Sequence, residues 1–165
     1  MTIEEIIKHG RFIENTRNPE YSSLELDFYI EFFEEPVSII VENSLDTETG
    51  PKAELLKELL NELLNLNPKY KLWMEENIWK HYDTCIGNGS YGMVTYEGFD
   101  DHKKANQAYF KIYNQEDSYA ALELRKIHID MDSSNRNFRL EYICPWDDEH
   151  GLSIWANNGQ MEMGY

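Results

Sequence analysis

The stretch LELDFYIEF, residues 24–32, decides the fold. Apolar side chains occupy every second position, and acidic or tyrosine side chains stand between them. A period of two is typical of a β-strand with one buried face. The string Glu34-Glu35-Pro36 interrupts the pattern, which resumes from Val37 to about Glu42. Two such runs around a short charged turn predict an antiparallel hairpin.

Two helices are predicted downstream of this hairpin. Pro51 follows an acidic, threonine-rich entry and stands at a tolerated first-turn position. Leucines then recur every three to four residues up to position 64, which places one apolar stripe on a helix of about 15 residues. Asn67-Pro68 ends this helix and opens an aromatic one that reaches Cys85. The short connection predicts an antiparallel helical pair.

The C-terminal third returns to strand patterns. A short element, a strand or a helix, is expected near 103–111, and a short helix is expected around 119–122. Alternation over 124–131, 138–144 and 152–156 predicts three strands, and Asn157-Asn158-Gly159 is a strong hairpin turn before a last strand. The prediction is an α+β fold in one domain, residues 1–165. Its mostly antiparallel sheet, an N-terminal hairpin plus a C-terminal meander, packs against the antiparallel helical pair.

Composition narrows the class of protein. The 165 residues include 31 acidic and 15 basic side chains, for a net charge of −16, and 41% are hydrophobic, enough to build a core. No stretch has the roughly 18 uncharged apolar residues of a membrane span. The acidic start differs from a secretory leader, so a cytoplasmic location is expected. Nucleic acid is disfavoured as a partner, because a negative chain is repelled by phosphates.

The string GNGSYGMV, residues 87–94, fits the glycine-rich pattern G-x-G-x-x-G-x-V of kinases and resembles the dinucleotide fingerprint. A dinucleotide loop must follow a strand and open a helix, whereas this string follows a predicted helix. A kinase would also need V-A-I-K, H-R-D and D-F-G strings, which the chain lacks. We therefore interpret these glycines as a helix stop followed by turns.

The string Cys144-Pro145-Trp146-Asp147-Asp148-Glu149-His150 lies between two predicted strands. Its carboxylates, imidazole and thiol could supply metal ligands or a general acid and base. Adjacent ligands on one short loop cannot all converge on one ion, however. The alternative is a tight β-connection in which Asp147 accepts turn amides, a carboxylate holds His150, and Trp146 packs on the sheet. A structural or partner-contacting loop is the favoured interpretation.

Two further clusters contain histidine. Cys85 lies one helical turn from His81, within reach of a nucleophile pair, but no orienting third group is evident. The triplet His128, Asp130 and Asp132 shares one strand face, which we expect to be solvated. Cys85 and Cys144 are too few for a disulfide framework and are expected to be reduced, although a bridge between them stays open. The sequence assigns no catalytic residue, no metal ligand and no cofactor.

Residues 144–152 resemble the signature C-x-W-D-x-E-H-G-L of a family of uncharacterised bacterial domains. In that family the signature precedes a short strand, a turn and another strand, and residues 153–164 fit this continuation. The order of elements upstream is similar too. Some relatives in that family are immunity proteins of polymorphic-toxin systems, and the resemblance implies the same role here.

These observations favour an acidic protein-binding domain that neutralises a basic protein toxin. Residues 1–60 hold 14 acidic and five basic side chains, and such a surface steers a basic partner. The predicted contact residues are Trp146, Asp147, Asp148, Glu149 and His150. The alternatives are a small hydrolase or metal-dependent enzyme that uses the 147–150 loop, and a housekeeping interaction module.

Overall fold

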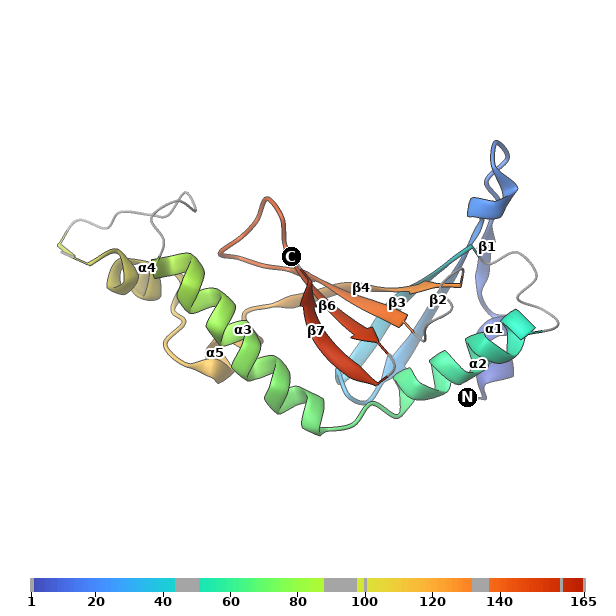
Figure 1. Ribbon diagram of the computed structural model, residues 1–165, viewed down its shortest axis with the longest axis horizontal. Helices are drawn as coiled ribbons and strands as arrows, with labels where there is room; N and C mark the ends of the chain where they lie inside the picture. The colour runs from blue at the N-terminus through green and yellow to red at the C-terminus, as the bar shows by residue number, and fades with distance from the viewer. Residues whose placement is uncertain are drawn as a thin grey trace. The chain divides into compact units, whose positions relative to one another are not determined.

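The computed structural model describes residues 2–43, 51–87, 98–99, 101–131, 137–157 and 159–164. Within them the chain is an α+β protein with a mostly antiparallel seven-stranded sheet and five α-helices (Figure 1). No helix among these residues has the length and apolar character needed to cross a bilayer. The helices are α1 (Ile3–Lys8), α2 (Pro51–Leu64), α3 (Lys69–Gly87), α4 (His102–Phe110) and α5 (Gln115–Ala120), with a 3-10 turn at Pro19–Tyr21. The strands are β1 (Arg11–Ile13), β2 (Ser23–Ile30), β3 (Glu35–Glu42), β4 (Glu123–Asp130), β5 (Asn137–Ile143), β6 (Leu152–Asn157) and β7 (Gln160–Gly164).

The chain divides into two compact units. The first comprises residues 1–67, 124–141 and 153–165, and the second comprises residues 68–123 and 142–152. Because α2 belongs to the first unit and α3 to the second, their pairing stays a prediction. The single domain over residues 1–165 also stays a prediction.

Strands β2 and β3 pair antiparallel, from Leu24 opposite Val41 to Ile30 opposite Glu35. The connecting turn ends at Glu34, whose φ of 58° is left-handed. The strand break expected at Glu34-Glu35-Pro36 is wrong by two residues at each boundary. Strand β2 already ends at Ile30 rather than Phe32, and β3 begins at Glu35 rather than Val37. Pro36 stands opposite Tyr29 near the end of the β2–β3 ladder, and β4 pairs with β3 only from Ile39 onward, so the proline lies at an edge of the sheet where it is tolerated.

The sheet order follows the sequence from β1 to β7, but β3 and β4 pair in parallel. A parallel pair needs a crossover, and here it contains α2, α3, α4 and α5. Figure 1 shows the cyan β3 and the orange β4 side by side in the same sheet. The sequence patterns predict strands but do not report this direction of pairing.

The core of the first unit contains the buried face of the sheet and the buried leucine stripe of α2. Alternate residues of β2, β3 and β4 are buried, as the period of two predicts. Helix α1 contacts both β2 and α2, and Thr2 caps it by accepting the Glu5 amide. The other face of the sheet is half-buried to exposed and carries the polar side chains. The most buried core residues are Leu26, Ile30, Ile39, Val41, Leu56, Leu59, Leu60, Leu63, Ile127, Ile129, Leu140 and Ile154.

The second unit is organised around α3, which packs against α4 and α5. Tyr82 is fully buried on α3, its hydroxyl donates to the Ile112 carbonyl at 3.3 Å, and its ring meets Phe110 edge-to-face. The element expected near 103–111 is the helix α4. The helix expected at 119–122 begins earlier, because the Asn114 side chain accepts the Asp117 amide and caps α5. The glycine string at 88–94, the helix entry at 46–50, Asp132 and Asn158 lie outside the described residues.

Candidate functional site

The connection between β5 and β6 holds all five predicted contact residues, and local hydrogen bonds fix its shape. The Asp147 amide donates to the Cys144 carbonyl at 3.1 Å, and the Gly151 amide donates to the Asp147 carbonyl at 2.9 Å. The Asp147 carboxylate accepts the His150 amide at 3.3 Å, which confirms the predicted turn role of this aspartate. Gly151 has a φ of 68°, and a Cβ there would lie 2.9 Å from the Tyr142 carbonyl oxygen. Only glycine fits that position without strain.

Trp146 is a structural anchor of this connection. Its side chain is buried, its ring centroid lies 5.0 Å from that of Tyr82 in an edge-to-face contact, and the indole Nε1–H donates to His81 Nδ1 at 3.2 Å. Both partners come from α3. The tryptophan therefore links the 144–151 connection to this helix within the second unit, and its contact with a partner stays a prediction.

The bond from Trp146 determines the chemistry of His81. Because the indole only donates, Nδ1 of His81 must accept and carry no proton. Burial lowers the pKa of His81, and the negative charge of Asp147 only partly opposes this shift. His81 is consequently a neutral imidazole whose Nδ1 is already engaged, which leaves that nitrogen unsuited to the role of a general base.

Cys85 is the nearest thiol to this histidine, with Sγ 3.7 Å from Nε2. Burial raises the pKa of Cys85 to about 11, and burial raises that of Cys144 to about 12. Both thiols are buried and unbridged. The thiolate is the reactive form of cysteine, so both groups are inert near neutral pH. The possible nucleophile pair on α3 is thus brought together in space, but its protonation state is unsuited to attack.

Asp147 and His150 form a contact of their own, with His150 Nδ1 3.0 Å from the Asp147 carboxylate, as predicted. The Asp147 side chain is 10% exposed, whereas that of His150 is 73% exposed. Asp148 and Glu149 are exposed beside them. Three polar side chains of the turn are therefore exposed to solvent, namely Asp148, Glu149 and His150. Asp147 and Trp146 are engaged in contacts that stabilise the turn itself. Partner contact through these residues stays a prediction.

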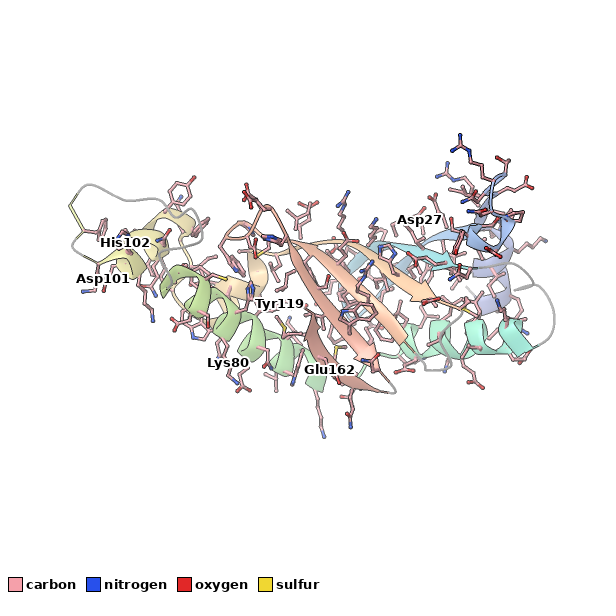
Figure 2. The ribbon with its side chains drawn as sticks, turned by 45° about the horizontal axis from the view of Figure 1, so that its top comes forward. Asp27, Lys80, Asp101, His102, Tyr119 and Glu162 are labelled. Carbon is pink, nitrogen blue, oxygen red and sulfur yellow. The ribbon has the colours of Figure 1, made fainter. Side chains whose placement is uncertain are left out.

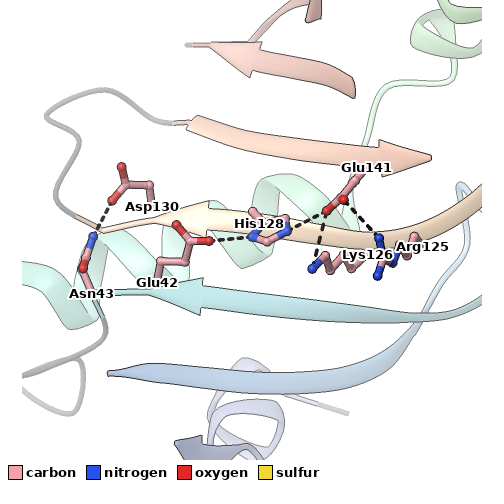
Figure 3. A network of polar contacts seen from close by, with 7 residues as sticks. All are labelled: Glu42, Asn43, Arg125, Lys126, His128, Asp130 and Glu141. Atoms are coloured by element: carbon pink, nitrogen blue, oxygen red, sulfur yellow. Dashed lines mark hydrogen bonds and ion pairs between the residues drawn. The ribbon is translucent and has the colours of Figure 1, made fainter. Parts of the chain in front are cut away.

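A second polar cluster, whose members lie far apart in the sequence, lies on the polar face of the sheet in the first unit (Figure 3). His128 on β4 contacts Glu42 on β3 through Nδ1 at 2.7 Å and Glu141 on β5 through Nε2 at 2.9 Å. Its side chain is 12% exposed, so the expectation of a solvated face is wrong at this residue. Both nitrogens face carboxylates, and only the imidazolium can donate from both.

Glu141 is the centre of charge in this cluster, which we call the His128 brace (Glu42, His128 and Glu141). Its carboxylate lies 3.6 Å from the cationic groups of both Lys126 and Arg125. Burial alone would raise the pKa of Glu141, but the His128 hydrogen bond and the nearby positive charges outweigh it and lower the pKa. The brace joins three neighbouring strands. No group of three or more histidine, cysteine or acidic residues in the described part of the chain is arranged to hold a metal ion.

Comparison with known proteins gives one match. A family model described as a domain of unknown function (DUF6985) matches residues 12–165. The match covers the sheet from β1 onward, all the helices after α1, and both polar clusters described above. No curated protein and no solved structure matched the chain.

Proposed function

The chain belongs to the family described as a domain of unknown function (DUF6985), and from that premise we propose that it is an acidic domain that binds and neutralises a basic protein. An immunity protein that blocks a toxin is the form of this function that we favour. We expect it to act in the cytoplasm, where both buried thiols stay reduced. The proposal assigns no catalytic residue and no cofactor to the chain.

The observation that carries the proposal is a set of exposed carboxylates without cationic partners. Asp148 and Glu149 are exposed on the turn that Asp147 and Gly151 hold in shape, and neither forms an ion pair within the described residues. The whole chain carries a net charge of −16. Carboxylates displayed on a rigid turn lose little entropy on binding, and a strongly negative surface accelerates encounter with a basic protein.

The alternative of a small hydrolase has one observation in its favour, the contact between Asp147 and His150. A carboxylate that orients an imidazole is half of a general-base arrangement. Against it, the His150 ring is largely exposed, and Cys85 and Cys144 are held as thiols. A binding role uses the same turn without requiring an activated nucleophile, so we favour it.

The test begins with capture of partners from the native cytosol at low salt, release at high salt, and identification of the released protein. Binding of the purified partner is then measured against two double variants that each remove two negative charges. Asp148→Asn with Glu149→Gln changes the proposed surface, and Glu116→Gln with Glu123→Gln changes exposed acids elsewhere. Exposed charge pairs contribute about 0.2–1 kcal/mol each, so the first variant should weaken binding about two- to thirtyfold.

The control variant should weaken binding less than twofold at the same ionic strength. Affinity should also fall steeply as salt rises, because exposed charges are screened within about 10 Å at 0.1 M salt. A partner that binds both double variants equally, or with an affinity indifferent to salt, contradicts the proposal. Hydrolysis of a model ester that His150→Gln abolishes would instead establish the enzyme alternative.

A further inference from the structure

Arg139 on β5 stands apart from the rest of this acidic surface. Its guanidinium lies over the ring of Trp155 on β6, with Cζ 5.3 Å from the ring centroid. The indole in turn lies against Gly164 of β7, where a Cβ would sit 2.7 Å from the indole Nε1. Glycine, tryptophan and arginine therefore form a stack that crosses three strands on the polar face of the sheet.

The hydrogen-bonding groups of this arginine are not used within the described residues. Arg139 forms no ion pair there, and its Nε is buried without a hydrogen-bond partner. The chain has 31 acidic side chains to offer, so an unpaired guanidinium is unexpected on it. A buried donor left unsatisfied costs free energy. Because this Nε is covered, a ligand has to bind through the terminal Nη groups of the guanidinium.

The carboxylates closest along the sheet have other partners. Glu141, two residues away on the same face of β5, is engaged by His128, Lys126 and Arg125. Glu162 on β7, which pairs with Trp155 and is labelled in Figure 2, accepts from the side-chain amide of Asn157 at 3.5 Å. The segment 124–141 also holds four Lys or Arg and three Asp or Glu, against 15 and 31 in the whole chain. Arg139 thus lies in a segment that is less acidic than the chain as a whole.

We propose that Arg139, held over the ring of Trp155, is a binding site for a carboxylate, which a side chain of the partner protein supplies. The planar fork of a guanidinium matches a carboxylate with two parallel hydrogen bonds, and stacking on an aromatic ring orients the fork. Phosphate sites usually add backbone amides from a glycine-rich loop or a helix N-terminus, and the stack offers only side chains from strands. The negative charge of the chain attracts the partner without fixing its orientation, and the Arg139 site would fix that orientation. The identity of the ligand as a partner side chain rests on the proposed function.

The test uses acetate as the probe, so it does not depend on any partner. Sodium acetate is titrated into the full-length 15N-labelled protein at constant ionic strength, and the Nε–Hε resonances of the arginines are followed. The Arg139→Lys variant identifies the Arg139 signal. Arg17, exposed and without an ion pair among the described residues, is the internal control. A parallel titration uses inorganic phosphate.

The Arg139 signal should move saturably, with a midpoint at least tenfold below that of Arg17, and the Trp155→Leu variant should raise the midpoint toward that of Arg17. Equal midpoints for Arg139 and Arg17 would overturn the site. A lower midpoint for phosphate than for acetate would overturn the assignment to a carboxylate. The two proposals can fail independently. If acetate does not bind, the proposed contact of the acidic turn with a partner is still open, and if no partner binds, the acetate result is still valid.

Discussion

Replacement of His128 by glutamine is expected to lower the free energy of unfolding by about 2 kcal/mol. Glutamine has one amide group that can donate to Glu42 or Glu141, but its carbonyl oxygen must then face the other carboxylate. The substitution keeps a similar volume and polarity. Its effect therefore reports the loss of one of the two side-chain hydrogen bonds that join His128 to these acids.

The magnitude follows from the two contacts and their exposure. A hydrogen bond to a charged group contributes about 1.5–3 kcal/mol, and the His128 side chain is 12% exposed, so little solvent screens it. Glu42 is 45% exposed and can regain water, and Glu141 keeps Lys126 and Arg125. These two compensations keep the expected loss below the roughly 3–5 kcal/mol of a fully buried pair that loses one partner.

Urea unfolding followed by circular dichroism measures this loss, with His150→Gln as the matched control. The His150 side chain is 73% exposed, so its replacement should change stability by less than about 0.5 kcal/mol. A double-mutant cycle of His128→Gln and Glu42→Gln should give a coupling of about 1 kcal/mol. Surface substitutions usually change the free energy of unfolding by no more than about 0.5 kcal/mol. A decrease smaller than this for His128→Gln, together with no coupling to Glu42, would refute the reasoning.

The pH dependence gives an independent check of the same brace. The pKa of Glu141 is lowered from its ordinary value of 4.5, so its stabilising contribution is present above 4.5 and is lost as the pH falls through the folded-state pKa. The His128→Gln variant lacks the hydrogen bond that lowers this pKa. Stability of the variant should therefore depend less steeply on pH below 4.5 than stability of the natural chain.

Three further predictions concern other parts of the molecule. Trp146→Phe removes the donor to His81 and should cost about 1–2 kcal/mol in urea unfolding; an unchanged midpoint would contradict the structural role of this indole. Cys85 and Cys144 should react with a thiol reagent at pH 7.5 only after unfolding, because burial raises their pKa values to about 11 and about 12; rapid reaction of the folded protein would argue against this burial. Gly164→Ala should destabilise by about 1–3 kcal/mol because the Cβ would meet Trp155, whereas Gly87→Ala at the open end of α3 should be neutral or stabilising; equal effects would count against the stack.

Much of the fold could be predicted because its patterns are local. The alternation of residues 24–32 and the leucines of α2 each bury one face, so their periods appear directly in the sequence. The direction in which β3 and β4 pair could not be predicted. An apolar strand presents the same alternation to a parallel and to an antiparallel neighbour, and nothing in either strand encodes the crossover between them.

The candidate site divides in the same way. The roles of Asp147 and His150 could be predicted because turn hydrogen bonds join residues within a few positions of one another. The His128 brace could not, because Glu42 lies 86 positions from His128 and meets it only through the parallel register. The sequence signal that best indicates the brace is His128 itself, a single histidine at a polar-face position of β4, which is rich in charged residues.

The parallel junction of β3 and β4 has a consequence for how the chain folds. The hairpin of β2 and β3 forms from neighbouring residues, whereas the brace between Glu42 and His128 closes a loop across 86 positions. For a flexible loop of that length the closure entropy is about 4 kcal/mol. During synthesis the outer edge of β3 is therefore open until the four crossover helices and β4 have been made. Prior folding of those helices shortens the effective loop, so the rate of sheet completion should depend on helical residues that never touch the sheet ladder.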